Sequence, residues 1–369
     1  MTSVLISGAS IAGLTLAYWL REYGFSLTVV EPTPGFRPGG QAIDLRGAAV
    51  EVARRMGLEQ ALQQRRLPAL GMTMLDAAGR ELSRTNTMTL TGGVFADDDY
   101  EILRDDLVDA LVQRIAPGVE YIFSDSVAAI SEEEDGLAVL TEGGRHRRFD
   151  LMIGADGMYS NTRRLCFGPH AKYINPVGMC VVNFTAPNIL GLDAWQYACW
   201  DGDVRYIVYP VRDNRELRVF LLFQRPDRPG DLRDPAAQRH IAVKHCRALS
   251  WRIPELVPAL FETDDFYFGE VAQVKMERWS LGRVGLTGDA AYCPSPLTGQ
   301  GSSLAVIGAY VLAAELNRCR GDHDRAFERY DQRMRPFVAL NQHLIRQLDV
   351  TEPDFAPIAR VKNAIDLDP

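Results

Sequence analysis

The feature that most restricts the fold is a glycine-rich loop near the N-terminus, between a buried strand and a helix. The chain of 369 residues opens with the apolar run SVLIS (3–7), the loop GASIAG (8–13) and the helical segment GLTLAYWLREYG (13–24). A second apolar run, SLTVVE (26–31), follows. Short β-branched runs predict buried parallel strands, and the segment between them predicts a helix that ends at Gly24. This order predicts a βαβ unit of an α/β fold.

The loop has the spacing of a dinucleotide-binding fingerprint. Gly8 and Gly13 occupy the first and third glycine positions of G-x-G-x-x-G, while Ser10 occupies the middle one. Ser10 is small enough to let a pyrophosphate approach the backbone, and the helix N-terminus offers free N–H groups and a partial positive charge. Glu31 ends the second strand, where an acid can accept hydrogen bonds from the ribose of an adenosine. The alternative is an ordinary βαβ unit with a glycine-rich turn.

Composition excludes several other classes of protein. The net charge of −8 disfavours a nucleic-acid or anionic-membrane surface. The six cysteines and six histidines lack metal-ligand or disulfide spacing, so we expect no metal. The N-terminus has no signal-peptide pattern, and the longest apolar run (304–314) is too short to span a bilayer. We therefore expect a cytoplasmic protein with no membrane span.

Two later stretches place polar groups at the ends of predicted strands. The stretch FDLMIGADGMYSNTRR (149–164) has Asp156 after its strand and Ser160 as the expected N-cap of a helix. The stretch GRVGLTGDAAYCPSPLTGQGSSLAVIGAYVLAAEL (282–316) has Asp289 after its strand, then a proline-stiffened loop and a long apolar helix. Free N–H groups at that helix start predict a cradle for a flat, partly negative group, with Asp289 accepting bonds from sugar-like hydroxyls.

The segments between these motifs are less specific. Residues 37–58 predict a strand, QAIDL, and a helix, with Arg37, Asp44 and Arg46 crowded around the strand. A solvated charged edge is an equally good interpretation of those three side chains. Residues 101–115 predict an amphipathic helix with Arg104 at its start, and residues 115–149 predict a meander of short strands that returns to the first sheet.

The three glycine-containing stretches, in this order, resemble the three FAD motifs of the group A flavoprotein monooxygenases, which have the p-hydroxybenzoate hydroxylase fold. The resemblance covers about residues 1–345 and is closest to tetracycline-modifying and polyketide-tailoring oxygenases, which share R-x-G-G-x-x-x-D (37–44) and LRDDLVDAL. It implies a Rossmann-type FAD-binding domain with an inserted antiparallel-sheet substrate domain and a C-terminal helix. The implied limits are 1–171 and 271–320 for the FAD-binding domain, 172–270 for the substrate domain and 321–369 for the helical segment.

The resemblance also implies roles for individual residues. Gly8, Ser10 and Gly13 would bind the pyrophosphate, with Ile11 and Ala12 beside them, and Glu31 the adenosine ribose. Around the flavin it implies Arg104, Asp44 and Arg46 as FAD neighbours, Asp289 at the ribityl chain, and Pro296, Gly299, Gln300 and Gly301 along the isoalloxazine ring. Arg37 would meet NAD(P)H, and Asp156 would lie between FAD and the path of that cofactor. The chain departs from the family at Ser10, at Tyr292 (often histidine) and at Ser303 (often asparagine).

Residues 172–270 are expected to supply the substrate site. The runs AWQYACW, VRYIVYPV and ELRVFLLFQ predict three antiparallel strands over the flavin, with possible cavity walls at Trp195, Tyr197, Tyr206, Phe220 and Phe223. An aromatic residue on a strand is, however, more often part of a core. After residue 320, a charged amphipathic helix is expected to break at Pro336 and to cover the mouth of the substrate site.

The resemblance implies an enzyme that uses NADPH or NADH and O2 to hydroxylate an electron-rich aromatic or polyketide-like substrate through a flavin C4a-hydroperoxide. Two alternatives remain at this stage: an FAD-dependent reductase, and a cyclase that uses bound FAD as a scaffold without oxygen insertion. The sequence identifies no catalytic base. It does not distinguish NADPH from NADH or hydroxylation from Baeyer–Villiger insertion, and it names neither the substrate nor the oligomeric state.

Overall fold

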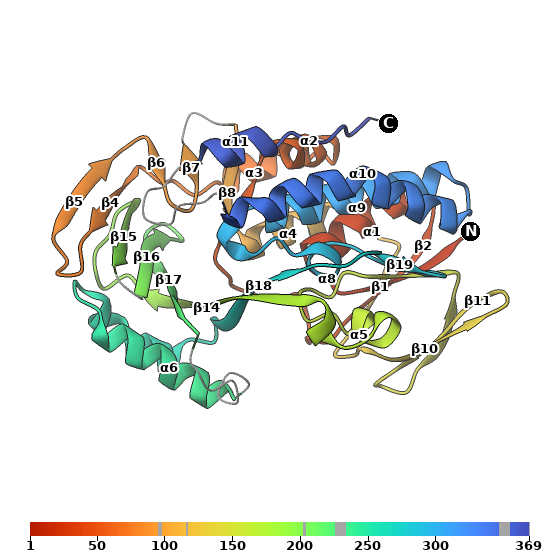
Figure 1. The fold of residues 1–369 in the computed structure, drawn as a ribbon, viewed down its shortest axis with the longest axis horizontal. Coiled ribbons are helices and arrows are strands. Elements are labelled where there is room, and N and C mark those ends of the chain that lie inside the picture. Colours follow the sequence, from red (N-terminus) through yellow and green to blue (C-terminus); the bar gives the residue numbers. More distant parts are fainter. Residues whose placement is uncertain (95–97, 116, 202–203, 226–233, 347–354, 369) are drawn as a thin grey trace.

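The computed structural model describes residues 1–94, 98–115, 117–201, 204–225, 234–346 and 355–368 (Figure 1). It is an α/β fold built around two large sheets, one of six strands and one of seven. In Figure 1, helices α9 and α10 lie along one side of the first sheet, which occupies the right of the view. The second sheet, with β4, β5 and β15, lies toward the left of the view. The expected division of the chain into a dinucleotide-binding part and a substrate-binding part stays a prediction.

The first sheet has the order β19-β20-β13-β1-β2-β9, and its pairs are parallel except β19–β20. Strand β1 pairs with β2 on one side and with β13 on the other, so the loop that follows β1 lies where the strand order reverses, the usual ligand position in such sheets. The strands are β1 (Ser3–Ser7), β2 (Ser26–Glu31), β9 (Val119–Phe123), β13 (Leu151–Gly154), β19 (Ser280–Leu281) and β20 (Val284–Leu286).

Helices cover this sheet and form the largest core. Helix α1 (Ile11–Glu22) packs on α9 (Gly301–Arg318), and α9 also contacts α2 (Ala48–Arg55) and α10 (His323–His343). The apolar run that forms α9 is buried along almost its whole length. The expected break at Pro336 is wrong, because α10 continues through it. Buried side chains on both sides of the proline, Met334 and Phe337, hold the two halves of α10 in the same core.

The segment 115–149 divides between two sheets. Strand β9 joins the first sheet beside β2, whereas β10 (Val127–Glu133), β11 (Gly136–Thr141) and β12 (His146–Phe149) form a separate antiparallel meander. The meander leads back into β13, as predicted. Helix α5 (Asn161–Phe167) follows β13, and the side chain of Ser160 accepts a hydrogen bond from the backbone N–H of Arg163, which confirms Ser160 as its N-cap.

The second sheet has the order β18-β14-β17-β16-β15-β4-β5. The three strands predicted from the aromatic runs are present as β15 (Trp195–Asp201), β16 (Val204–Val211) and β17 (Glu216–Gln224), and they pair antiparallel. The sheet extends beyond 172–270, because β4 (Gly71–Leu75) pairs with β15 and carries β5 (Glu81–Thr85), while β18 (Phe266–Val274) ends past residue 270. The seventh strand is β14 (Ile174–Pro187).

The predicted helix over 101–115 begins later than expected. Residues Tyr100–Leu103 form strand β8, which pairs antiparallel with β3 (Ala42–Leu45), and helix α4 runs from Arg104 to Arg114. The tertiary pairing with β3 overrides the local helical pattern, since β8 is buried on both faces. Arg104 thus stands at the junction of strand and helix.

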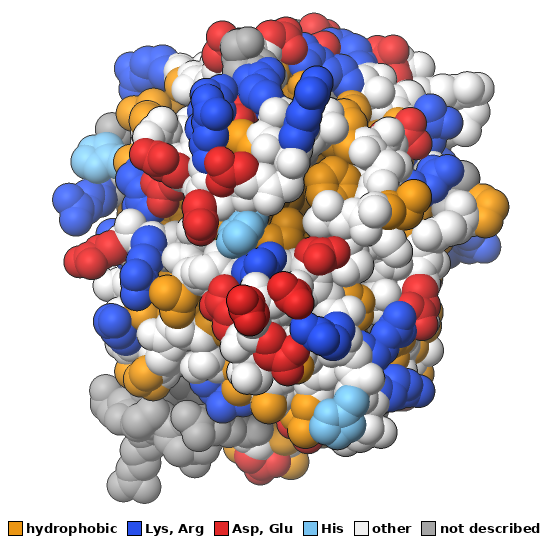
Figure 2. Space-filling view, turned by 90° about the vertical axis from the view of Figure 1, so that its right-hand side faces the viewer, with side chains coloured by type: hydrophobic (Ala, Val, Ile, Leu, Met, Phe, Trp, Pro, Cys, Tyr) orange, Lys and Arg blue, Asp and Glu red, His pale blue; other side chains and the backbone are white. Residues whose placement is uncertain are grey.

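The remaining elements are short, apart from helix α6 of 14 residues. They are α3 (Glu59–Arg65), β6 (Met88–Thr89), β7 (Gly93–Val94), α6 (Pro235–Ala248), α7 (Ala259–Glu262), α8 (Asp289–Tyr292), α11 (Ala356–Val361) and 3-10 turns at His170–Lys172, Ile253–Leu256, Pro296–Thr298 and Leu344–Arg346. On the face shown in Figure 2, acidic and basic side chains are intermixed. Within the described residues, no helix is both long and apolar enough to cross a bilayer.

Candidate cofactor site

The loop after β1 is built so that only glycine fits at two of its positions. Gly8 has φ +109°, and a Cβ there would lie 2.5 Å from the carbonyl oxygen of Ala155 at the end of β13. A Cβ on Gly13 would collide with the carbonyl oxygen of Gly8. The first turn of α1 therefore sits directly on the loop, and its N–H groups point out of the end of the sheet.

Glu31 braces this loop from the neighbouring strand. Its Oε2 accepts a hydrogen bond from the backbone N–H of Ala9 (2.8 Å), and its Oε1 accepts from the N–H and hydroxyl of Thr33 (3.2 and 2.8 Å). The carboxylate therefore stands at the carboxyl end of β2, beside the loop. Ser10 is the N-cap of α1 without a side-chain capping bond, which leaves its hydroxyl available to a ligand.

The three glycine-containing stretches meet at one end of the first sheet. A Cβ on Gly8 would lie 3.1 Å from the Cα of Asp156, and one on Gly288 would lie 2.9 Å from the Cβ of Ala12. A Cβ on Gly301 would lie 4.0 Å from Oδ1 of Asp289. Stretches that are far apart in the sequence are thus neighbours in space, as a shared dinucleotide site requires.

The late loop, residues 293–301 between α8 and the first turn of α9, has two buried polar side chains in or beside it, Asp289 and Gln300. Burial raises the pKa of Asp289, and a hydrogen bond from Cys293 opposes this shift. Gln300, the N-cap of α9, is fully buried, and neither polar atom of its side chain has a hydrogen-bond partner within the described residues. Buried polar groups are normally paired. A bound molecule with hydroxyl and amide groups at the start of α9 would supply the partners that the Gln300 side chain lacks.

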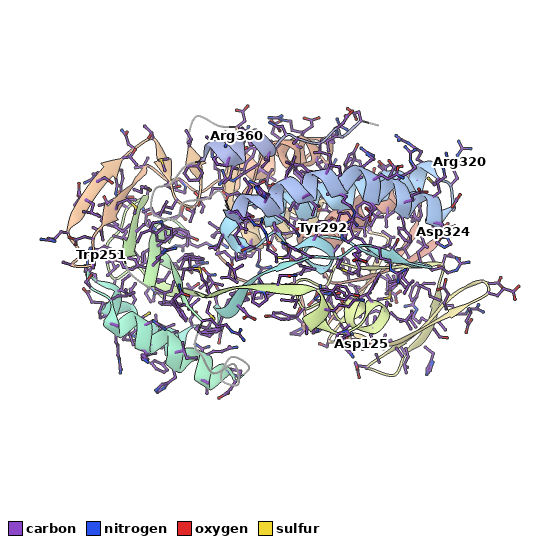
Figure 3. All side chains as sticks on the ribbon, viewed as in Figure 1. Asp125, Trp251, Tyr292, Arg320, Asp324 and Arg360 are labelled. Atoms are coloured by element: carbon purple, nitrogen blue, oxygen red, sulfur yellow. The ribbon has the colours of Figure 1, made fainter. Side chains whose placement is uncertain are left out.

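Tyr292 and Ser303, two of the departures from the family pattern, both have structural partners. The Tyr292 hydroxyl lies 3.0 Å from that of Thr287 and 2.8 Å from that of Tyr330, and it is buried between α8 and α10 (Figure 3). The Ser303 hydroxyl accepts a bond from the N–H of Arg46 (3.0 Å) and donates to the carbonyl oxygen of Asp44 (3.3 Å). Ser303 therefore ties β3 to the first turn of α9.

Arg104 organises the loop that carries Arg37. Its guanidinium donates to the carbonyl oxygens of Arg37 (2.5 Å), Pro38 (3.2 Å) and Gly39 (2.6 Å). Burial and the nearby Arg37 lower the pKa of Arg104 to about 10, and its Nε is buried without a partner within the described residues. Arg37 itself is exposed. The alternative of a solvated charged edge, raised for Arg37, Asp44 and Arg46, thus fits Arg37 but not the other two, whose side chains are only 11% (Asp44) and 3% (Arg46) exposed.

Asp44 and Arg46 form a buried charged cluster beside the late loop. Arg46 pairs with Asp44 (2.9 Å) and Asp99 (3.7 Å), and a Cβ on Gly299 would lie 3.5 Å from Oδ2 of Asp44. Burial raises the pKa of Asp44 to about 6 against the opposing effect of Arg46. Burial and the charge of Asp44 raise the pKa of Glu101, the residue opposite Asp44 on β8, to about 7. Sequence reasoning missed Glu101, because only the pairing of β3 with β8 brings it here.

Asp156 has mainly structural partners. Its carboxylate accepts bonds from the hydroxyls of Ser160, Thr162 (2.8 Å) and Ser7 (3.3 Å) and from the N–H of Thr162 (2.9 Å). These bonds anchor the start of α5 to β1. Its predicted place between two cofactors stays a prediction, and so does the position of Pro296, which is exposed at the start of the late loop.

A cavity of about 150 Å³ lies between the Arg37 loop and the second sheet. Asp265 closes one side of it by accepting bonds from the N–H of Gly40 (3.0 Å) and the hydroxyl of Thr185 (2.6 Å), and Arg218 donates to the carbonyl oxygen of Gly40 (3.1 Å). The lining residues are Arg37, Pro38, Gly40, Gln41, Asn183, Phe184, Arg218, Val219, Asp264, Asp265, Phe266 and Tyr267. Half of them lie on β14, β17 and β18, where the sequence carries no recognisable motif.

The expectation that five aromatic residues wall the substrate cavity is wrong for most of them. Tyr206 and Phe223 are fully buried in the core between the second sheet and α6, and Tyr197 packs against that core. The Trp195 indole donates a hydrogen bond to the hydroxyl of Thr73. Trp251, labelled in Figure 3, stacks on Tyr197 within this helix-side core. Phe220 lies on the opposite face, beside Val271 and Leu297 of the late loop. Successive side chains of a strand point to opposite faces of the sheet. Phe220 and Phe223 are three residues apart on β17, so they lie on opposite faces.

Comparison with known protein families agrees with a cofactor site at this end of the first sheet. A family model described as "FAD binding domain" matches residues 1–342. A flavin-dependent monooxygenase of Legionella longbeachae is 37% identical over 340 residues, which cover 92% of this chain and 86% of that protein.

The chain belongs to the FAD-dependent monooxygenases.

Other similar proteins agree with this family. An uncharacterized protein of Mycobacterium tuberculosis is 44% identical over 94% of this chain and 93% of its own length. The crystal structure of the tetracycline destructase Tet(55) superimposes with a TM-score of 0.88 at 33% identity, over 99% of this chain and 98% of that one. This monooxygenase is therefore an oxidoreductase that binds FAD. The close-packed glycine loop and the buried Gln300, which lacks a partner among the described residues, are features that would suit such a cofactor.

Proposed function

We propose that this monooxygenase uses NAD(P)H and O2 to hydroxylate an electron-rich, polycyclic aromatic or polyketide-like substrate. The observation that carries the proposal is the contact between the late loop and the second sheet. Leu297 of that loop packs on the apolar face formed by Val181, Leu222 and Val271, and Phe220 lies beside it. A flavin held along this loop would face that side of the sheet. The likeness to Tet(55), a tetracycline destructase, supports a polycyclic substrate.

The proposed FAD-binding groups divide by the part of the cofactor they meet. The glycine loop with Ser10, Ile11 and Ala12 would hold the pyrophosphate, and Glu31 the adenosine ribose. Asp289 would accept bonds from the ribityl hydroxyls, and the first turn of α9, which begins at Gly301, would donate to the pyrimidine edge of the ring. When bound, FAD supplies the transfer of electrons from the nicotinamide cofactor and the activation of oxygen.

The chain's own contribution is to bind, orient and exclude water. Arg37 is an exposed cation at the edge of the 150 Å³ cavity, where it would attract the phosphates of NAD(P)H. The apolar side chains around Leu297 would keep bulk water from the reacting centre, which protects a reactive oxygen species from decay. Neither a dedicated nicotinamide domain nor a catalytic base is needed for this division of work. A cytoplasmic location would supply the reduced nicotinamide that this reaction needs.

The experiment is a coupled measurement of NAD(P)H and O2 consumption with a panel of polycyclic phenols. The proposal expects slow NAD(P)H oxidation with hydrogen peroxide release when no substrate is present. It expects faster oxidation with less peroxide when a substrate binds. A rate that is the same with and without every phenol, with no peroxide formed, would indicate a reductase instead. Parallel runs with NADH and NADPH show which nicotinamide is used.

A further inference from the structure

A buried pair of carboxylic acids, Asp44 and Glu101, lies between the late loop and a small cavity. Asp44 on β3 and Glu101 on β8 are directly opposed in the antiparallel ribbon, so their Cβ atoms lie within about 4.5–5.5 Å. The side chain of Asp44 is 11% exposed and Glu101 is 8% exposed. Two like charges this close and this buried cannot both ionise readily, which favours one proton held between them.

One end of the pair faces the late loop. Oδ2 of Asp44 lies next to Gly299, at 3.5 Å from the position a Cβ there would take. Arg46 binds Asp44 and fixes its orientation, and Ser303 holds the backbone of both residues to α9. Asp44 is therefore placed to exchange a proton with a group bound along Gly299–Gly301.

The other end of the pair faces a small cavity that leads outward. Oε1 of Glu101 is buried with no hydrogen-bond partner within the described residues. Glu101 lines a cavity of about 20 Å³ together with Thr91, Gln196 and Tyr209, and the exposed Pro68 also borders it. That volume has room for about one water molecule, and polar side chains surround it. A water there would connect Glu101 with solvent.

We propose that Asp44 and Glu101 act together as a proton relay between solvent and the late loop. The inference rests on the proposed function, whose balance is NAD(P)H + H⁺ + O2 + R–H giving NAD(P)⁺ + R–OH + H2O. One proton enters from solvent in each cycle. It passes from water to the Glu101 carboxylate, from Glu101 to the Asp44 carboxylate, and from Asp44 to the acceptor at the loop. The pair ends each passage at its starting charge, because the proton that Asp44 gives up is balanced by the one that Glu101 takes from the cavity water.

The surroundings keep this pair poised near neutral pH. Burial raises the pKa of both acids, to about 6 for Asp44 and about 7 for Glu101, and the charges of nearby groups also shift each pKa. The charged and titratable groups that face the pair are Arg46 and Asp99 from its own segments, Arg66 from the segment before β4, Tyr209 from β16, and Lys362, which binds Asp99 (3.0 Å). A proton can therefore leave or join the pair at the pH where the enzyme works.

The test compares Glu101→Gln with Glu315→Gln in the FAD-loaded protein. Glu315 is an equally buried acid, but Arg329 and Arg333 bind it and its pKa is lowered, so it should be ionised throughout. Infrared spectra between about pH 5 and 8 should show a protonated-carboxyl band that titrates in the wild type. Glu101→Gln should remove or shift this band, and Glu315→Gln should leave it.

The second arm is the rate of product formation after FAD occupancy is checked by absorbance. Glu101→Gln should slow hydroxylation on the order of a hundredfold, as expected for loss of a proton-transfer group, while Glu315→Gln keeps the wild-type rate. Absence of the titrating band, or wild-type turnover by Glu101→Gln at every pH, would overturn the relay. A wild type that shows the band but hydroxylates no substrate would instead refute the proposed function, and the relay's role with it.

Discussion

Replacement of Asp289 should weaken FAD binding and raise the free energy of unfolding of the FAD-free protein. The carboxylate lies at the mouth of α9, and burial raises its pKa. Ionisation of such a buried acid lowers the stability of the folded protein. Hydrogen bonds from the hydroxyl groups of the bound cofactor would offset this loss. Asp289→Ala and Asp289→Asn remove the charge and keep the loop, since α8 and the turn before α9 are held by other bonds.

The size of the first effect follows from charge-assisted hydrogen bonds, each of which contributes about 1.5–3 kcal/mol. Loss of one such bond should therefore weaken FAD binding on the order of ten- to a hundredfold. The second effect depends on pH. Because the folded-state pKa is raised, the neutral form favours folding, and wild-type stability is lost as the pH rises through the folded pKa. The advantage of Asp289→Asn without FAD should thus grow toward high pH.

The assay is FAD titration by fluorescence quenching, followed by urea denaturation of the FAD-free proteins at several pH values. Asp324→Asn is the matched control, because it removes the same charge from a side chain that is 81% exposed (Figure 3). The control should change neither quantity. Unchanged FAD affinity in both Asp289 variants would show that the late loop is not the flavin cradle, and a stability difference independent of pH would refute the electrostatic argument.

Three further substitutions test separate parts of the account. Arg37→Ala should stay yellow but show slower flavin reduction and a higher KM for NAD(P)H in stopped-flow experiments; a wild-type reduction rate would make Arg37 only a solvated loop charge. Gly13→Ala puts a methyl group against the Gly8 carbonyl, so FAD binding should be lost, and a yellow variant with unchanged thermal stability would contradict the loop geometry. Tyr292→Phe removes a buried hydrogen bond from Thr287 and one from Tyr330, whose hydroxyls still bond to each other (3.3 Å), and should cost about 0.5–1.5 kcal/mol in urea denaturation; equal stability would show that the Tyr292 hydroxyl has no net effect.

The FAD-binding half of the molecule was largely predictable because its signals are local. Buried strands, the glycine loop and the helix that ends at a glycine all lie within the βαβ unit, and the family motifs follow in order. The N-cap at Ser160 likewise needs only its own helix. The start of α4 at Arg104 was missed, because residues 100–103 pair with a strand about sixty residues earlier, which no local pattern records.

The substrate-facing half was less predictable because it depends on pairing between distant strands. Strand β4 joins the second sheet through β15, so the sheet's composition cannot be inferred from 172–270 alone. The orientation of Tyr206 and Phe223 toward α6 was fixed only by register, since a shift of one residue would reverse each side chain. For the same reason Arg218, Asp265 and Glu101 carried no signal in the sequence.

The most direct test of the central claim is to follow the oxygen atom itself. The FAD-loaded protein would be given NADPH, ¹⁸O2 and a polycyclic phenol, and the product would be weighed by mass spectrometry. The account predicts a product that carries one ¹⁸O atom, formed only when the nicotinamide cofactor is present. A product with the mass of the substrate would indicate a cyclase. A product that gains hydrogen but no labelled oxygen would indicate a reductase, and either result would contradict the monooxygenase function argued from the late loop and the second sheet.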